Sequence, residues 1–359
     1  MRVLHIVGSM HAGGIENFIM NLYRNIDRSK VQFDFVTHTG SDPAYVAEIE
    51  KLGGRIYELP RLTAYPVSNL KQIKKLVREN GYVAVIRHTP NALVAPQLLA
   101  ARRGGSVAIC HSHNTTDPKL FLHKLGRFVL RHSRVKRFAC SSQAGIWMFG
   151  DKSFEVVHNA IDVDRFAYDP DKRLQIRAEF GLPENAPVFG HIANFIESKN
   201  HRYLMQIYKA ISEDMPDAVF FCLGEGSLRQ SIMEQAKELG LEKRIYFTGM
   251  RSDVEAFMSA MDVMIFPSIF EGLPLTLIEA QAAGLPMLVS DAVTKEAEVT
   301  EGLISWKSID ADPAEWAKEA IESFGEHKPR TCQRESIKAA GYDIHELARW
   351  YEEYFESLK

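Results

Sequence analysis

The stretch VMIFPSIFEGLPLTLIEAQAAGLPMLVSD (263–291) contains two short apolar runs on either side of a helical pattern. The runs VMIFPS (263–268) and PMLVSD (286–291) are typical of buried strands. Between them, Pro274 is well suited to the first position of a helix. Because a helix is the usual connection between parallel strands, the stretch predicts one strand–helix–strand unit.

The same alternation of strands and helices runs along the whole chain. A polar connector at 161–173 divides it into two series, which predicts an α/β fold with two doubly wound domains. Ligands bind at the carboxyl ends of the strands in such folds, so we expect the domains to face one another across a ligand-binding cleft. The predicted strands are 2–7, 33–38, 55–59, 83–88, 106–110, 137–141, 154–159, 187–193, 218–224, 244–249, 263–268 and 286–291, and the tail from about 312 to 359 is predicted to be helical.

The composition argues against several classes of protein. The 359 residues are 46% apolar, which suffices for two cores, and the net charge of −3 argues against a nucleic-acid-binding protein. Residues 1–165 hold 23 basic and 13 acidic side chains, whereas residues 166–359 hold 20 and 33. The first half is therefore the one expected to meet anionic partners.

The cysteines and the apolar runs indicate a cytoplasmic protein. The cysteines lie far apart without a Cys-x-x-Cys pair, which argues against a disulfide framework or a zinc site. No segment approaches the roughly 20 apolar residues that span a bilayer, and the first residues lack a signal-peptide pattern. The four cysteines are Cys110, Cys140, Cys222 and Cys332.

The predicted helix start in the opening stretch is suited to a phosphorylated, hydroxyl-rich ligand. The backbone N–H groups of Leu275 and Thr276 lack helical partners and can hold a diphosphate without a metal. Glu279, about one turn into the helix, can accept hydrogen bonds from ribose hydroxyls, and Glu271 in the preceding loop can do so from a sugar. Alternatively, both acids are favourable charges near a helix start, which explains Glu279 better than Glu271.

Three other loops follow predicted strands and could approach an anion. Gly13 and Gly14 precede a predicted helix, although their spacing is not that of a dinucleotide-binding motif. Lys199 lies at another helix start, where a cation is unfavourable unless an anion also binds there. Gly224 belongs to a Gly-Glu-Gly turn. Ordinary tight turns and a solvated lysine are the alternative interpretations.

Two histidines and a basic segment complete the candidates in the first half. His111 and His113 follow a predicted strand; a metal pair lacks an evident third ligand, so a polar or acid–base role is favoured over it. A structural role for these histidines competes with both. Segment 118–138 is basic, amphipathic and free of acids. It predicts either contact with an anionic membrane surface or lipid acceptor, or a helix that covers the sheet with a solvated basic face.

These motifs together resemble the retaining glycosyltransferases of family 4, in particular those of bacterial polysaccharide synthesis. The most specific match is FPSIFEGLPLTLIEAQAAGLPMLVSD (266–291), in which two glutamates are separated by seven residues. The other matching segments are GGIENFIMNL (13–22), HSHNT (111–115), ACSSQAGIWMFG (139–150), VVHNAIDVDRF (156–166), GHIANFIESKNH (190–201), LGEGSLRQSI (223–232) and FTGMRSDVEAFM (247–258).

The resemblance implies a GT-B fold with two Rossmann-like domains. It implies an acceptor-binding domain at 1–165, a nucleotide-sugar-binding domain at 166–340, and a terminal helix at 341–359 that crosses back to the first domain. Catalysis by front-face attack, with retention of configuration and without a metal or cofactor, is also implied.

The resemblance also assigns roles to individual residues. Glu271 and His113 are expected at the transferred sugar, and Glu279 at the ribose. The remaining donor-binding residues are expected to be Gly13, Gly14, Asn194, Lys199, Gly224, Arg251, Gly272, Leu273, Leu275 and Thr276.

One departure from the family pattern concerns the leaving diphosphate. Asn194 stands where the family usually has an arginine, so a charge that would stabilise the leaving group is missing. Lys199 alone or Arg251 could substitute; otherwise turnover is slow or absent. Ala160 in place of the usual glycine is a milder change.

The sequence therefore predicts transfer of a hexose or N-acetylhexosamine from a nucleotide sugar, with UDP as the favoured nucleotide, to a polysaccharide or lipid-diphosphate-linked acceptor. We expect a cytoplasmic enzyme without a nucleic-acid partner, and segment 118–138 is the candidate for a peripheral membrane contact. The alternatives are a non-catalytic nucleotide-sugar-binding protein and a sugar-nucleotide epimerase of the same fold.

Overall fold

The computed structural model describes residues 1–11, 13–114, 120–326 and 329–359. The chain forms two compact units, of which the first comprises Met1–Ala160 and Asp343–Lys359 and the second Ile161–Tyr342. The sequence places the division at 165/166 instead. Residues 161–165 belong with the second unit because the Ile161 N–H donates to the Tyr342 carbonyl (2.8 Å) and Arg165 pairs with Glu255 (2.9 Å).

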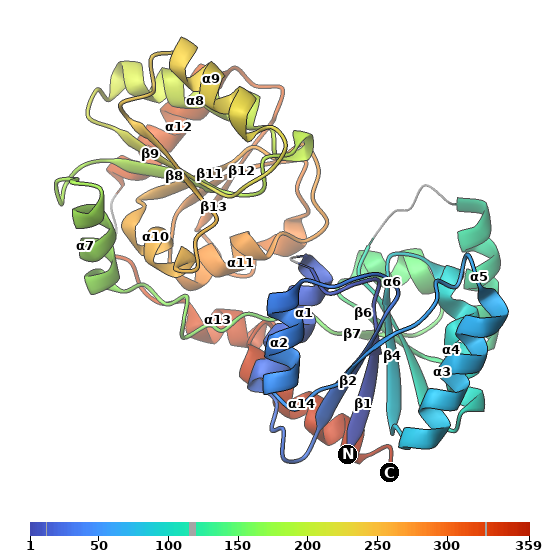
Figure 1. Ribbon diagram of the computed structural model, residues 1–359. Coiled ribbons are helices and arrows are strands. Elements are labelled where there is room, and N and C mark those ends of the chain that lie inside the picture. Colours follow the sequence, from blue (N-terminus) through green and yellow to red (C-terminus); the bar gives the residue numbers. More distant parts are fainter. Residues whose placement is uncertain (12, 115–119, 327–328) are drawn as a thin grey trace. The chain divides into compact units, whose positions relative to one another are not determined.

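The first unit is built on a seven-stranded parallel sheet with the order β3-β2-β1-β4-β5-β6-β7 (Figure 1). The chain order reverses between β1 and β4, which is the Rossmann arrangement. The strands are β1 (Arg2–Ile6), β2 (Gln32–Thr37), β3 (Ile56–Glu58), β4 (Ala84–Thr89), β5 (Val107–Ser112), β6 (Lys136–Ala139) and β7 (Glu155–Val156).

Helices cover both faces of this sheet. One face carries α1, α2 and α14, and the other carries α3, α4, α5 and α6 (Figure 1). Successive residues of a strand point to opposite faces, so Val3 and Phe33 pack under the first group while Leu4 and Ile6 pack under the second. The helices are α1 (Gly14–Asn25), α2 (Pro43–Lys51), α3 (Pro66–Asn80), the 3₁₀ turn η1 (Ala92–Val94), α4 (Ala95–Arg103), α5 (Leu120–His132), α6 (Ser142–Phe149) and α14 (Ile344–Glu356).

The second unit repeats the same design with a six-stranded parallel sheet of order β10-β9-β8-β11-β12-β13. Here the chain order reverses between β8 and β11. The strands are β8 (Val188–Ile192), β9 (Val219–Leu223), β10 (Ile245–Gly249), β11 (Val263–Phe266), β12 (Met287–Ser290) and β13 (Ile304–Lys307).

Its helices also form two layers. One face of the sheet is covered by α8, α9 and α12, and the opposite face is covered by α7, α10, α11 and α13 (Figure 1). The helices are α7 (Pro170–Glu179), the 3₁₀ turn η2 (Glu197–Lys199), α8 (His201–Asp214), α9 (Arg229–Glu238), α10 (Val254–Ala260), α11 (Leu275–Ala282), the 3₁₀ turn η3 (Lys295–Ala297), α12 (Pro313–Gly325) and α13 (Arg334–Ala339).

Every predicted strand has a counterpart in the structure, and one observed strand was not predicted. β13 was missed because its four residues are only partly buried, so they lack a long apolar run. α11 begins at Leu275, and Pro274 is its N-cap rather than its first residue. Among the described residues, no helix is both long and apolar enough to cross a membrane.

Candidate functional site

The predicted donor-binding residues of the second unit all lie at the carboxyl edge of its sheet. They follow β8, β9, β10 and β11, and two of these strands, β8 and β11, border the point where the chain order reverses. This is the position at which doubly wound sheets bind ligands. The edge therefore provides a candidate site within one unit.

Lys199 and Glu271 contact one another at this edge. Their side chains form an ion pair, although 72 residues separate them in the sequence. The Ile269 N–H also donates to the Ser198 carbonyl (2.8 Å), which ties the loop after β11 to η2. The Lys199 ammonium lies 5.6 Å from the centre of the Phe266 ring. A cation predicted for the diphosphate and an acid predicted for the sugar are thus adjacent.

The start of α11 provides backbone donors beside this pair. No side chain from the described residues caps the helix, so the N–H groups of Leu275 and Thr276 at its first turn remain available to a ligand. Gly272 is exposed and Leu273 is partly buried in the loop that leads to the helix. An anion at this position would gain from both the N–H groups and the helix dipole.

Glu279 is a half-buried acid within the same helix. The pKa of its carboxyl group is raised to about 7, mainly because the surrounding protein excludes water; the nearby Arg165 lowers the pKa and Glu255 raises it, both to a smaller extent. A carboxyl group that titrates near neutral pH is a recurrent property of binding and catalytic sites.

Asn194 and Gly224 lie in loops that pack against one another. A Cβ atom at Gly224, whose φ is +133°, would lie 2.1 Å from the Ala193 carbonyl oxygen, so this close approach requires glycine. The Phe195 N–H donates to the Glu225 carbonyl (2.9 Å) and completes the contact. Asn194 itself is exposed.

The side chain of Arg251 is already paired with two neighbouring carboxylates. Its guanidinium donates to both carboxylate oxygens of Asp253 (2.8 Å each) and of Glu179 (3.0 and 3.1 Å), and it lies 4.9 Å from the centre of the Phe257 ring. Hydrogen bonding to Asp253 is the main cause that raises its pKa. Two carboxylates already balance this charge, so Arg251 is poorly placed to replace the arginine missing at Asn194.

In the first unit, the predicted glycine loop lies at the start of α1. Gly13 is the N-cap in an extended conformation, and Gly14 is the first helical residue. A Cβ atom at Gly14 would meet no described atom within 4 Å, whereas one at Gly13 would meet the flexible end of Glu16 (2.5 Å) and, at ordinary contact distance, the His11 carbonyl oxygen (3.9 Å). The protein fold alone therefore does not require glycine at either position, which leaves close ligand approach as a reason for both.

The predicted His113 belongs to a group of histidines at the carboxyl ends of β1, β4 and β5. His113 Nε2 lies 3.0 Å from His88 Nδ1, and His88 Nε2 lies 2.9 Å from His5 Nδ1. His111 is the register partner of His88 and packs edge-on against Phe18. Burial lowers the pKa of His5 and His113 to about 3 and that of His88 and His111 well below the usual value.

The structure supplies the third candidate metal ligand that the sequence did not reveal. Nitrogen atoms of His88, His111 and His113 lie within 4.8 Å of one another, so the absence of a third ligand is no argument against a metal. The third histidine becomes visible only once the strand order is known, because His88 lies on β4, which neighbours β5. The direct His88–His113 hydrogen bond nevertheless uses two of the nitrogens that a metal would need.

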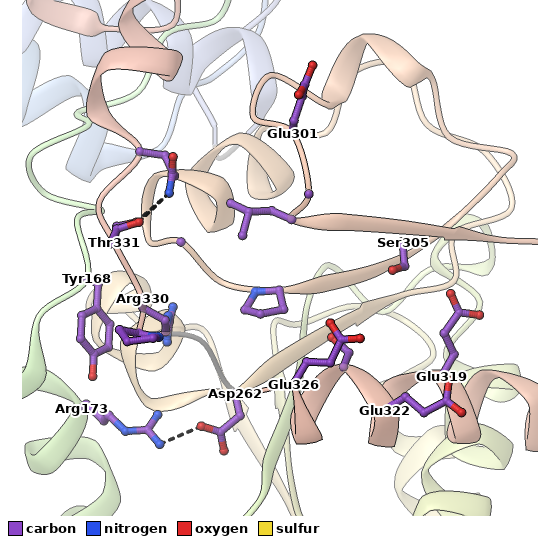
Figure 2. A pocket seen from close by; sticks show the side chains of 17 residues that line it. Tyr168, Arg173, Asp262, Glu301, Ser305, Glu319, Glu322, Glu326, Arg330 and Thr331 are labelled. Atoms are coloured by element: carbon purple, nitrogen blue, oxygen red, sulfur yellow. Dashed lines mark hydrogen bonds and ion pairs between the residues drawn. The ribbon is translucent and has the colours of Figure 1, made fainter.

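A cavity of about 870 Å³ in the second unit lies away from the candidate site. Asp262 and Pro286 in its wall precede β11 and β12, so it opens at the amino edge of the sheet (Figure 2). Arg173 donates to Asp262 (2.7 Å), and Arg330 donates to carbonyls including that of Met261 (2.9 Å). Internal partners satisfy both guanidinium groups, which indicates a structural role.

The predicted basic segment 118–138 forms α5 and β6; its residues 118–119 lie outside the described residues. Leu125 and Phe128 on α5 are 62% and 63% exposed. A groove of about 480 Å³ runs between α3, α4 and α5. Its wall is formed by Leu70, Lys71, Lys74, Ala92, Leu93, Ala95, Pro96, Leu99, Ala100, Arg103, Leu125, Gly126 and Val129.

Solved structures resemble this fold over nearly its whole length. Anabaena HepE in complex with UDP has a TM-score of 0.82 and 18% identity, and the alignment covers 99% of this chain and 100% of that one. A glycosyltransferase from Rickettsia africae has the same TM-score and 16% identity, with coverage of 99% and 98%. The predicted GT-B fold is confirmed.

Sequence comparisons identify the family. The model described as Glycosyltransferase Family 4 matches residues 12–165, and that described as Glycosyl transferases group 1 matches 172–340. Putative glycosyltransferase EpsF of Bacillus subtilis (strain 168) is 33% identical over 357 residues, which cover 95% of this chain and 93% of that protein. The UDP-Gal:alpha-D-GlcNAc-diphosphoundecaprenol alpha-1,3-galactosyltransferase of Escherichia coli is 26% identical, with coverage of 63% and 62%. These matches show that the chain belongs to the family-4 glycosyltransferases of GT-B fold.

Proposed function

We propose that this glycosyltransferase moves a hexose or N-acetylhexosamine from a UDP-linked sugar to a polysaccharide or lipid-linked saccharide, with retention of configuration. The observation that carries the proposal is the uncapped start of α11 beside the Lys199–Glu271 pair. Backbone donors and a cation suit the diphosphate, and carboxylates suit sugar hydroxyls. HepE, a structural neighbour, is known in complexes with UDP and with UDP-glucose, which supports this donor class.

The proposed reaction needs no metal. Lys199 and the amino end of α11 supply positive charge where a divalent cation would otherwise neutralise a diphosphate. The leaving phosphate itself takes the proton of the acceptor hydroxyl in the proposed front-face mechanism. Activity that persists in the presence of a chelator supports this part of the proposal, and loss that added Mg²⁺ or Mn²⁺ reverses contradicts it.

The proposed acceptor is carried by an anionic lipid at the cytoplasmic membrane surface. Helices α3, α4 and α5 hold nine Lys and Arg residues and a single acid, Glu79. The groove between them has ten apolar or glycine residues and three cations in its wall, and no acid. Such a surface matches one hydrocarbon chain with an anionic headgroup. The Escherichia coli relative, whose name specifies a diphosphoundecaprenol-linked acceptor, supports the same class.

The test is a panel of UDP-sugars with the purified chain. We expect one sugar to raise the thermal stability most, because a ligand that binds only the native state stabilises it. With that donor, radiolabel should transfer to an undecaprenyl-diphosphate-linked saccharide, and NMR of the product should show a retained anomeric configuration. Binding without transfer or hydrolysis for every sugar contradicts the proposal.

A non-catalytic nucleotide-sugar-binding protein is the second candidate. It is favoured by the exposed, uncharged Asn194 together with the engagement of Arg251 by Asp253 and Glu179. The variant Asn194→Arg discriminates between the two. A silent parent that becomes active on this substitution favours the binding protein, whereas an active parent favours the transferase.

A further inference from the structure

We infer that His88, supported by His5, positions His113 and sets its tautomer so that His113 presents an N–H donor to the bound substrate. The inference rests on the proposed function in assigning His113 to the reacting sugar. Its structural basis is a series of three imidazole rings. His5 Nδ1 meets His88 Nε2 at 2.9 Å, and His88 Nδ1 meets His113 Nε2 at 3.0 Å.

The three rings are neutral at physiological pH. They are buried among aromatic side chains, and burial lowers the pKa of each. A neutral imidazole carries one proton, so one nitrogen donates and the other accepts. Because each hydrogen bond needs one donor and one acceptor, the tautomer of each ring determines that of the next.

Only two arrangements of protons satisfy both hydrogen bonds. In one, all three rings carry the proton on Nδ1, and in the other all three carry it on Nε2. The first leaves a lone pair at His5 Nε2 and an N–H at His113 Nδ1. The second leaves an N–H at His5 Nε2 and a lone pair at His113 Nδ1.

The closed end of the series decides between them. Among the described residues, His5 Nε2 has no hydrogen-bond partner, and the ring lies 4.2 Å from Phe33 and 5.7 Å from Phe35 between centroids. A buried N–H without an acceptor is rarer in proteins than an acceptor without a donor. His5 is fully buried, whereas His113 is partly exposed and can meet a ligand. The arrangement with the proton on Nδ1 is therefore the one that leaves its remaining N–H, at His113, where an acceptor can reach it.

The open end points to a ligand. His113 Nδ1 is buried and has no partner in the described part of the chain. A buried N–H of this kind requires an acceptor. The ligand atom that it meets is therefore an acceptor oxygen, such as a hydroxyl or a phosphate oxygen of the sugar donor. His88 touches no substrate in this scheme and is a positioning residue.

Two substitutions of His88 separate positioning from packing. His88→Gln keeps an amide that can accept from His5 and donate to His113, whereas His88→Phe keeps the ring volume and removes both hydrogen bonds. Positioning predicts that His88→Gln retains most of kcat and that His88→Phe loses roughly 10- to 100-fold in kcat with little change in KM. A purely structural role predicts the opposite order, since Phe fits the aromatic surroundings better.

A ¹⁵N NMR measurement of the imidazole tautomers tests the inference without any sugar donor. We expect His113 to be protonated on Nδ1 in the parent and in His88→Gln, and to become a mixture in His88→Phe. Protonation on Nε2 in the parent, or an unchanged tautomer in His88→Phe, overturns the inference. Tight binding of Zn²⁺ that shifts the His88, His111 and His113 signals together also overturns it in favour of a metal site. If no sugar is transferred at all, the proposed function fails, but the tautomer measurement still tests the inference about His88 and His113.

Discussion

Glu279 shows how one side chain can link folding to ligand recognition. Its carboxyl group titrates near pH 7 in the folded chain, whereas the same group in an unfolded chain titrates near 4.5. Between these values the folded state holds a proton that the unfolded state has lost. The free energy of unfolding therefore falls as the pH rises from about 4.5 to about 7. Above about pH 7, Glu279 adds no further pH dependence.

We expect Glu279→Gln to remove this dependence. Glutamine has the shape of the protonated acid but cannot ionise. The difference in the free energy of unfolding, variant minus parent, should therefore grow from pH 5 to pH 8. The free energy of unfolding in urea at both pH values measures the effect. Parallel pH profiles of the two proteins would show that Glu279 does not titrate in this range.

The same carboxylate should make donor binding depend on pH. A charged acceptor forms stronger hydrogen bonds to hydroxyls than a neutral one, by about 1–2 kcal/mol or roughly 5- to 30-fold in affinity. We expect the affinity for a UDP-sugar to rise between pH 6 and pH 8 in the parent but not in Glu279→Gln. Because the diphosphate diester keeps its charge in this range, calorimetric titration isolates the protein group.

Local structure that depends on neighbours in sequence could be predicted, whereas contacts that depend on neighbours in space could not. The uncapped amides of Leu275 and Thr276 follow from the helix start that Pro274 marks, although Pro274 is the N-cap rather than the first helical residue. The Lys199–Glu271 ion pair depends on how two loops meet. His88 escaped notice because a single histidine in a strand has no local pattern, and its role emerges only from the order in which the strands pair.

At the scale of elements, the second sheet is anchored by a buried cluster of charges. Asp262 precedes β11 and accepts hydrogen bonds from Arg173 (2.7 Å), Arg177 (2.9 Å) and the Val188 N–H of β8 (2.9 Å). The side chains of Asp262 and Arg177 are 3% and 2% exposed. One carboxylate thus joins α7 to the two central strands.

We expect Asp262→Ala to destabilise the chain by about 3–5 kcal/mol, because it leaves the buried guanidinium of Arg177 without its counter-charge. Urea unfolding measures the loss. Glu213→Gln is the matched control, since it removes an exposed ion pair with Lys209 and should change stability by less than about 0.5 kcal/mol. Equal effects of the two changes would contradict the anchoring role.

The elements themselves were largely predictable from alternating strands and helices, and their exceptions have physical causes. β13 offers only four residues, partly exposed, at the edge of the sheet. Lys199 was placed at the start of a helix but lies in η2, because Asn200, with φ of +57°, turns the chain before α8 begins. A left-handed asparagine of this kind leaves little trace in an apolar pattern.

At the scale of the whole molecule, the uneven charge predicts selective binding to anionic membranes. The parent protein should co-sediment with vesicles of phosphatidylglycerol but not with vesicles of phosphatidylcholine. Replacement of Lys71, Lys74 and Arg103 by glutamine should weaken binding by roughly two orders of magnitude, at about 1 kcal/mol for each charge.

Replacement of three lysines of the acidic second unit by glutamine is the matched control. Lys209, Lys237 and Lys243 serve this purpose because they lie outside the groove. Their loss should leave sedimentation unchanged. If both triple variants weaken binding equally, membrane binding depends on the overall charge rather than on the proposed groove, and the groove proposal is wrong.

The position of α14 has a consequence for the order of events during synthesis. Ile344, Ala348, Tyr351 and Phe355 are at most 2% exposed and close the apolar face formed by α1 and the first sheet. A ribosome makes 160 residues of the first unit and the whole second unit before it reaches this helix. The second unit can therefore finish folding first, while the first waits with an open apolar face that chaperones could recognise. A stop codon just before α14 should accordingly yield an aggregating polypeptide, even though every candidate substrate-binding residue has already been translated.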